Sequence, residues 1–430
     1  MNSIGKYRWL ICGLLFLATT INYIDRQILS LIKPILDDQL HWTNEDFGKV
    51  NAAFQGAYAI GVLGFGWFVD RFGSKLGYGV SIVAWSLAAM GHALVSTAGG
   101  FFNARIFLGL GEAGNFPSAI KSVAQWFPKG ERALATSIFN SGTNMGAIVA
   151  PAVVPLLALS FGWQSPFFVA GVAGLLWLGL WIAFYDTPEK SKRLSSSELD
   201  YIKSDADEAL EDRSGRVPWL GLLKYRQAWS FVVAKFMTDP VWYFLLTWLP
   251  DYFKSSRSLD IKSSWSLLVT IYAIVTVLSI FGGWLPGHLT KRGWSVTRAR
   301  KTGMLIYALC VMPIFAATSV GNWMAVLLIG LAGAAHQAWS ANLFTTVSDM
   351  FPKITVASII GLGTMAGSIG GILFPIVTGK LLDHFKADPT AGYTILFGYC
   401  GLAYVVCFGI HHLLAPKFEQ IKVQIVPDRA

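Results

Sequence analysis

Residues 9–30 read WLICGLLFLATTINYIDRQILS, an apolar run that closes on an aspartate and an arginine side by side. A helix needs about 20 apolar residues to cross a bilayer, and this run supplies them. A charge in the membrane interior costs about 3 kcal/mol on insertion scales, so it is rare unless it faces a cavity or a partner. The run therefore predicts a membrane helix, and Asp25 and Arg26 predict a functional site on it.

The composition of the whole chain is that of a membrane protein. Of its 430 residues, 54% are hydrophobic and 14% are charged, whereas ordinary soluble domains carry roughly 25% charged residues. The first run lacks a small-residue cleavage site, so we expect it to remain as the first span. Cys12, Cys310, Cys400 and Cys407 fall in apolar segments without paired spacing, so we expect neither a disulfide framework nor a metal site, and no cofactor.

Further apolar segments of similar length bring the predicted spans to twelve, all of them helical. A polar stretch at 186–225 separates the first six from the last six. We therefore expect an all-α integral membrane protein with a six-helix bundle at 1–185, a cytoplasmic linker, and a second six-helix bundle at 226–430. The spans are predicted near 9–32, 48–69, 77–96, 101–126, 133–158, 164–185, 227–252, 264–289, 301–319, 322–349, 355–382 and 391–414.

Basic residues indicate the orientation of these spans. About two thirds of the 34 Lys and Arg residues precede the first span, follow the even-numbered spans or follow the last one. Cytoplasmic segments are enriched in these residues, so both termini are predicted to be cytoplasmic. The same bias accounts for the net charge of +9, and no nucleic-acid partner is needed to explain it.

The two halves share a weak internal repeat. QWFPKGERA (125–133) falls on DMFPKITVA (349–357), and at the same offset Gly146 falls on Gly370 and Pro151 on Pro375. Parallel repeats are typical of transporters built from two bundles, with the substrate cavity near the bilayer midplane. A chance coincidence of Gly and Pro positions is the alternative.

Charged residues in the first and fourth spans are the strongest site candidates. Adjacent helical residues point about 100° apart, so Asp25 and Arg26 each need a counterpart on another helix. Arg105 and Glu112 are seven residues apart, which returns both to one helix face, about 10 Å apart along the axis. Close packing and a bend are predicted nearby from Gly109, Gly111, Gly114 and Pro117.

The chemistry of these four residues separates their roles. A guanidinium offers a carboxylate a planar, bidentate fork, so Arg26 and Arg105 are predicted to bind an anion. A carboxyl that burial protonates and a neighbouring arginine ionises can exchange a proton, so Asp25 and Glu112 are predicted to gain and lose one. The alternatives are a snorkelling pair at the end of the first span, and an Arg105–Glu112 contact that only fixes two helices.

Spans of the second half also contain polar and aromatic side chains, which offer hydrogen-bond donors and acceptors and an aromatic surface to a ligand. Core or interfacial packing is the alternative for the aromatic residues among them. Lys235 and Asp239, four residues apart, are predicted to form an intrahelical ion pair. The predicted substrate-binding residues of this half are Trp242, Tyr243, His336, Gln337 and Asn342.

The loop after the second span reads GWFVDRFGSK at 66–75. It resembles the signature of the major facilitator superfamily, in the pattern G-x-x-x-D-R-x-G-x-K. The resemblance implies a cytoplasmic gating motif whose charged contacts break and reform between states. A basic turn flanked by two helix-end glycines is the alternative. The residues of this motif are Gly66, Asp70, Arg71, Gly73 and Lys75.

Four longer stretches carry a narrower resemblance that covers nearly the whole chain. They are INYIDRQ (21–27), ARIFLGLGEAGNFPSAIKSVAQWFPKGERA (104–133), FMTDPVWYFLLTWLP (236–250) and GAAHQAWSANLFTTVSDMFP (333–352). Together they resemble the organic anion/proton symporters, and the last two resemble bacterial hexuronate transporters. The resemblance implies the major facilitator fold in the bacterial inner membrane, and proton-driven uptake of a sugar acid such as galacturonate or glucuronate.

The same resemblance adds two residues and leaves several functions open. It implies that Tyr58 lies in the sugar site, with aromatic packing as the alternative. It also implies that Lys121 binds substrate, although an ideal helix puts Lys121 almost opposite Glu112 unless it bends at Pro117. An aldonate or aldarate symporter for galactonate or glucarate is the alternative of the same fold. A membrane-embedded enzyme would need a nucleophile–base set, metal ligands or a phosphate loop, which the sequence lacks, and a transporter-like sensor would need a larger soluble domain. A monomer in the bilayer is expected.

Overall fold

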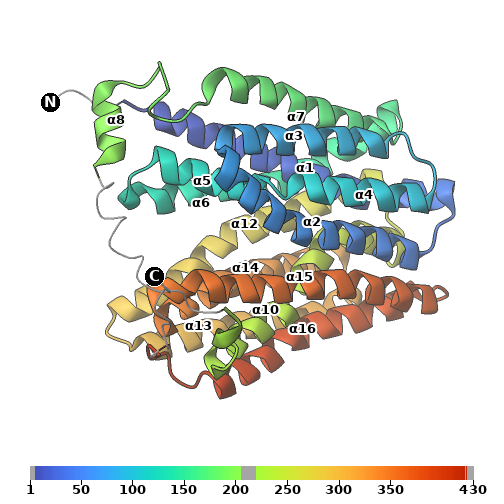
Figure 1. Cartoon of the computed structure of the whole chain (residues 1–430). Coiled ribbons are helices and arrows are strands. Elements are labelled where there is room, and N and C mark those ends of the chain that lie inside the picture. Colours follow the sequence, from blue (N-terminus) through green and yellow to red (C-terminus); the bar gives the residue numbers. More distant parts are fainter. Residues whose placement is uncertain (1–4, 205–218, 422, 424–430) are drawn as a thin grey trace. The chain divides into compact units, whose positions relative to one another are not determined.

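The computed structural model describes residues 5–204, 219–421 and 423. The secondary structure of this described part is helical, without a strand, which confirms the predicted all-α class. The chain divides into two compact units, Met1–Glu211 and Asp212–Ala430. Figure 1 shows the helices of each unit running alongside one another.

The first unit is built from long helices joined by short turns. The side chain of Thr43 caps one of them, because it accepts the backbone N–H of Asp46 at 3.0 Å and satisfies a donor at the helix start. The helices are α1 (Tyr7–Leu40), α2 (Asn44–Phe72), α3 (Ser74–His92), α4 (Ala98–Glu112), α5 (Asn115–Trp126), α6 (Lys129–Phe161), α7 (Ser165–Phe184) and α8 (Ser196–Lys203).

The second unit repeats the pattern with one short 3₁₀ segment. Pro250 lies in the first turn of α11, where its missing N–H breaks no hydrogen bond of that helix. The elements are α9 (Trp219–Leu222), α10 (Arg226–Thr247), α11 (Leu249–Ser255), α12 (Ile261–Lys291), α13 (Val296–Val311), η2 (Met312–Thr318), α14 (Asn322–Met350), α15 (Lys353–His384) and α16 (Pro389–Leu414).

The predicted spans coincide with these helices. Nine helical segments of the described residues are long and apolar enough to cross a membrane. The remaining predicted spans fall on α3, on α4 with α5, and on α10 with α11. α4 and α5 have 15 and 12 residues, so only the two together reach the length of a crossing.

The predicted linker at 186–225 is partly described. Its residues 205–218 lie outside the described residues, while α8 belongs to the first unit and packs against the start of α1. The buried Glu198 of α8 accepts the backbone N–H groups of Tyr7 at 3.2 Å and Arg8 at 3.1 Å. A carboxylate at this position satisfies free donors at the start of α1. Figure 1 shows α8 beside the beginning of α1.

Candidate functional site

The position of α4 is set by its close approach to α2. A Cβ atom added at Gly109 would lie 2.5 Å from the carbonyl oxygen of Phe54, so only glycine lets the two backbones come this near. α4 then ends at Glu112, and α5 starts at Asn115 after a short turn. The predicted bend is therefore present, but it precedes Pro117, which lies in the first turn of α5 where proline is tolerated.

An ion pair between α1 and α4 forms the centre of the site. Arg26 Nε lies 2.6 Å from Glu112 Oε2, and the Glu112 side chain is fully buried. A charge-assisted hydrogen bond of this length partly offsets the cost of burying both ions. The prediction that Arg26 has a counterpart on another helix is confirmed.

Aromatic rings surround the other sides of Arg26. Its guanidinium carbon lies 4.6 Å from the ring centroid of Tyr58, 4.8 Å from that of Tyr23 and 5.2 Å from that of Phe54. Such contacts stabilise a cation through the quadrupole of the ring. Tyr58 therefore lies beside Arg26, and Tyr23 and Phe54 are neighbours that the sequence did not single out.

Arg105 joins the same group of side chains. Its Nη2 donates to the backbone carbonyl of Arg26 at 3.3 Å, and its guanidinium lies 5.5 Å from the ring of Phe54. Arg105 and Glu112 both reach α1, as their seven-residue spacing predicts. Arg26 Nη2 and Arg105 Nε make no hydrogen bond with any described residue, although both are buried. Two guanidinium groups therefore keep unused donors.

Asp25 is buried beside this group but takes no part in its ion pair. Neither of its carboxyl oxygens has a hydrogen-bond partner among the residues that the structure describes. Arg105 and Glu112 are within electrostatic range of it. The prediction that Asp25 has its own counterpart on another helix stays a prediction: Arg105 of α4 attracts its carboxylate, but no ion pair joins the two among the described residues, and Glu112 of α4 pairs with Arg26.

Asn22 is a neighbour that sequence reasoning missed. It is fully buried and lies one helical turn before Arg26, on the same face of α1. Its side-chain amide forms no well-aligned hydrogen bond within the described part of the chain. The signal was present in INYIDR, where an amide precedes an intramembrane arginine by four residues.

A second group of predicted residues lies in the second unit. The rings of Trp242 and His336 are stacked, with centroids 5.4 Å apart and planes inclined by 2°. His336 Nδ1 lies 2.5 Å from the hydroxyl of Tyr404, which donates to the carbonyl of Thr238 at 3.3 Å. Tyr404 was not predicted, because no local pattern relates α14 to α16.

The other predicted residues of this unit differ in their surroundings. Asn342 exchanges two hydrogen bonds with Arg300 of α13: its Nδ2 donates to the Arg300 carbonyl at 2.9 Å, and Arg300 Nη1 donates to its Oδ1 at 3.4 Å. Its amide is thus engaged between helices. Gln337 and Tyr243 are half-buried. The predicted intrahelical pair of Lys235 and Asp239 is confirmed at 2.7 Å.

Lys121 is brought to the loop motif rather than to Arg26. Its Nζ donates to the carbonyl of Val69 at 2.8 Å and lies 3.1 Å from Asp70 Oδ1. The break between α4 and α5 turns Lys121 toward the end of α2. The motif has a second ion pair, between Lys75 and Asp186 at 3.1 Å. The contacts of its acidic residue therefore run to α5 and not to the adjacent Arg71, which is exposed.

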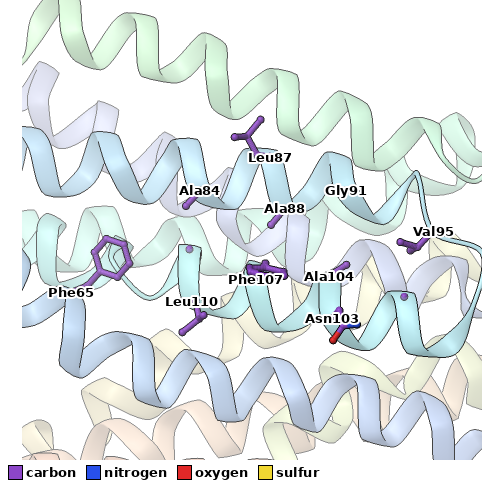
Figure 2. A pocket seen from close by; sticks show the side chains of 12 residues that line it. Phe65, Ala84, Leu87, Ala88, Gly91, Val95, Asn103, Ala104, Phe107 and Leu110 are labelled. Atoms are coloured by element: carbon purple, nitrogen blue, oxygen red, sulfur yellow. The ribbon is translucent and has the colours of Figure 1, made fainter.

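A groove on the first unit is unsuited to an anion. It has a volume of about 640 Å³, and Figure 2 shows Phe65 of α2, Ala84 and Ala88 of α3, and Ala104 of α4 along it. Asn103 is the one polar side chain among its lining residues. No basic residue lines it, so it lacks the cation that a carboxylate ligand requires.

Comparison with known proteins gives a consistent result. The family described as Major Facilitator Superfamily matches residues 15–375. A hexuronate transporter of Escherichia coli (strain K12) is 28% identical over 410 residues, 93% of this chain and 94% of that protein. A probable galactarate/D-glucarate transporter of Bacillus subtilis (strain 168) is 32% identical over 399 residues, 87% and 86% of the two chains. The inward-facing, occupied crystal structure of a bacterial homologue of the human lysosomal transporter Spinster has a TM-score of 0.77 at 16% identity, covering 96% of this chain and 98% of that one.

Proposed function

Because the chain belongs to the Major Facilitator Superfamily, we propose that it takes up a sugar acid together with protons by alternating access. Membership confirms the family expected from the GWFVDRFGSK motif, and it confirms the expectation of a transporter rather than an enzyme.

The buried Arg26–Glu112 pair is the observation that carries the proposal. An ion pair inside a membrane helix bundle is costly to maintain for stability alone. Here Arg26 and Arg105 also retain donors without partners among the described residues. Those donors fit a carboxylate, which accepts two parallel N–H bonds from a guanidinium.

Exchange of partners at Arg26 couples the substrate to the proton. An arriving carboxylate competes with Glu112 for Arg26, and the released Glu112 accepts one proton, which keeps the number of buried charges constant. When the substrate leaves, Glu112 loses that proton and pairs with Arg26 again. Asp25, which lacks an ion-pair partner in the described part of the chain, is the second candidate proton carrier.

The predicted substrate-binding residues of the second unit carry groups that suit a sugar. The stacked Trp242 and His336 offer an aromatic surface and a ring nitrogen, which suit the apolar face and the hydroxyls of a pyranose. Gln337 and Tyr243 add polar groups on the same two helices. A substrate that binds Asn342 or Lys121 must displace Arg300 or Asp70, which engage their polar atoms.

A hexuronate is the preferred substrate, with an aldonate or aldarate as the alternative. The first choice is favoured by the hexuronate transporter that matches over 93% of the chain, and the alternative by the probable galactarate/D-glucarate relative at 32% identity. We further assign the chain to the bacterial inner membrane with both termini in the cytoplasm, the side favoured by its basic residues.

Uptake by proteoliposomes tests this function. Labelled galacturonate should accumulate when the outside is acidic, and unlabelled glucuronate should compete better than galactonate or glucarate. Liposomes without protein give the background. Saturable uptake that does not depend on the proton gradient would contradict proton coupling. Stronger competition by glucarate would favour the alternative substrate.

A further inference from the structure

A row of buried polar side chains runs between α3 and α5 in the first unit. Ser74, Tyr78 and Ser81 recur on α3 at spacings of four and three residues, and Asn115, Ser118 and Ser122 recur on α5 at spacings of three and four. All six are at most 1% exposed. These spacings place each set on one helix face.

One end of the row is a continuous hydrogen-bond network. Ser122 Oγ donates to the hydroxyl of Tyr185 at 3.1 Å, and Tyr185 donates to Gln125 Oε1 at 3.0 Å. Ser74 Oγ lies 2.6 Å from the same hydroxyl and donates to Gln125 at 2.7 Å. Asp186, the residue after Tyr185, is partly exposed and pairs with Lys75. The network therefore ends one residue before a charged pair at the surface of the unit.

The other end of the row lies close to Glu112 along the chain. Tyr78 donates to Asn115 Oδ1 at 2.5 Å, and Asn115 follows Glu112 by three residues across the α4–α5 turn. Three polar atoms at this end, Glu112 Oε1, Asn115 Nδ2 and Ser118 Oγ, have no hydrogen-bond partner among the described residues, and their side chains are fully buried. Buried polar atoms are nearly always satisfied by protein or by ordered water.

We propose that this row conducts protons between Glu112 and the surface at Asp186, through its hydroxyls and through water molecules bound at Glu112 Oε1, Asn115 Nδ2 and Ser118 Oγ. The inference rests on the proton coupling of the proposed function. The proton then travels along α3 and α5, while the exchange of Glu112 for the substrate carboxylate takes place at Arg26 on α1.

Each transfer along this path is balanced. Protonated Glu112 gives its proton to a bound water, the water passes one of its own protons to the Ser118 oxygen, and that hydroxyl releases its original proton onward toward Ser122 and Tyr185. A proton leaves to solvent near Asp186, and Glu112 remains as the carboxylate that pairs with Arg26. Hydroxyls and water can relay protons because each both donates and accepts. The amides of Asn115 and Gln125 orient their neighbours.

Small polar residues at helix interfaces also occur as packing contacts alone, so the test must separate relay from packing. Ser118→Ala removes the relay oxygen, Ser118→Thr keeps a hydroxyl, and Ser122→Ala interrupts the path one turn further on. Ser86→Ala is the matched control: Ser86 is equally buried on α3 with an unpartnered Oγ within the described residues, and it packs beside Gly174 of α7 instead of on α5.

The experiment compares two rates in proteoliposomes of full-length protein. Counterflow of labelled galacturonate reports substrate exchange, and a trapped pH dye reports substrate-driven proton entry. Ser118→Ala and Ser122→Ala should keep counterflow and slow proton entry by up to about tenfold, the scale of one lost hydrogen bond. Ser118→Thr and Ser86→Ala should match the unsubstituted protein in both rates.

The outcomes separate this inference from the proposed function. If proton entry in Ser118→Ala and Ser122→Ala stays at the unsubstituted rate, or if Ser86→Ala slows it equally, the row is packing and the inference fails while proton-coupled uptake stands. If the unsubstituted protein shows no galacturonate counterflow, or counterflow without proton entry, the proposed function fails and the proton path falls with it. If Ser118→Ala does not reach the membrane, the rate of proton entry in Ser122→Ala decides between the outcomes.

Discussion

Arg26 and Glu112 are 86 positions apart in the chain, and their side chains meet at 2.6 Å inside one unit. The contact joins the middle of α1 to the last residue of α4. Forming or breaking this ion pair therefore affects both helices. An anion that takes Arg26 from Glu112 changes the link between two helices as well as the charge of the site.

Arg26→Ala should abolish uptake of galacturonate. Truncating one member of a buried charge pair costs about 3 kcal/mol or more, which corresponds to roughly a hundredfold loss of transport. Arg26→Lys should also be impaired, because an ammonium lacks the bidentate fork. Initial rates, normalised to the protein in the membrane, measure the effect. Arg298→Ala is the control, because Arg298 is exposed. Normal uptake rates in Arg26→Ala would show that Arg26 does not bind the substrate carboxylate.

Glu112→Gln should separate substrate exchange from accumulation. The amide imitates a permanently protonated carboxyl, so substrate binds and exchanges while the proton gradient has no effect on it. We expect counterflow near the level of the unsubstituted protein and no concentration of substrate. Asp25→Asn should behave in the same way if Asp25 carries a second proton. Accumulation by Glu112→Gln with an unchanged pH dependence would make Glu112 a structural residue, with His336 the next candidate to test.

Trp242→Ala should weaken substrate binding without ending transport. An aromatic contact contributes about 1 kcal/mol beyond its buried area, so KM should rise about fivefold to tenfold while kcat changes little. Concentration series of galacturonate uptake give both constants. Trp229→Ala on the same helix is the control, because Trp229 is exposed and bonds to the carbonyl of Leu223. Equal effects of the two substitutions would argue against a sugar contact.

Acid should loosen the end of the first unit at which α1, α6 and α8 meet. Hydrogen bonds from Arg8 hold the pKa of Glu131 below its ordinary value, and a bond from Tyr201 adds to the effect. A carboxyl with a lowered folded-state pKa contributes stability above its unfolded pKa, and this stability is lost as the pH falls through the folded one.

Glu131→Gln should therefore lower the thermal unfolding midpoint at pH 7, and the difference from the unsubstituted protein should shrink at about pH 4 and below. A charged hydrogen bond of this kind contributes about 1.5–3 kcal/mol. Unfolding followed in detergent at both pH values measures the difference. Glu189→Gln, which removes the exposed pair of Lys203 and Glu189 at 4.0 Å, should have little effect at either pH. A constant offset at both pH values would exclude ionisation as the cause.

The positions of the helices and the polar face of α4 could be predicted from the sequence. Arg105 and Glu112 could be placed together because their spacing is local, and Arg26 needed only the high cost of an unpaired charge in a membrane. Lys121 could not be placed, because the turn before α5 depends on the contact of Gly109 with the backbone of α2. The hydrogen bond between His336 and Tyr404 was also invisible, since it depends on how α14 packs against α16.

The connection between α2 and α3 has a mechanical consequence. α2 ends at Phe72 and α3 begins at Ser74, so Gly73 alone joins them, with a φ of +86° that glycine adopts without strain. A connection of one residue is too short for the two helices to move independently. When Asp70 is released from Lys121 and α2 tilts, this one-residue connection transmits the movement directly to α3. Replacing Gly73 by alanine would strain this connection, because a φ of +86° is unfavourable for a residue with a Cβ atom, whereas adding residues there would let α2 move while α3 stays still.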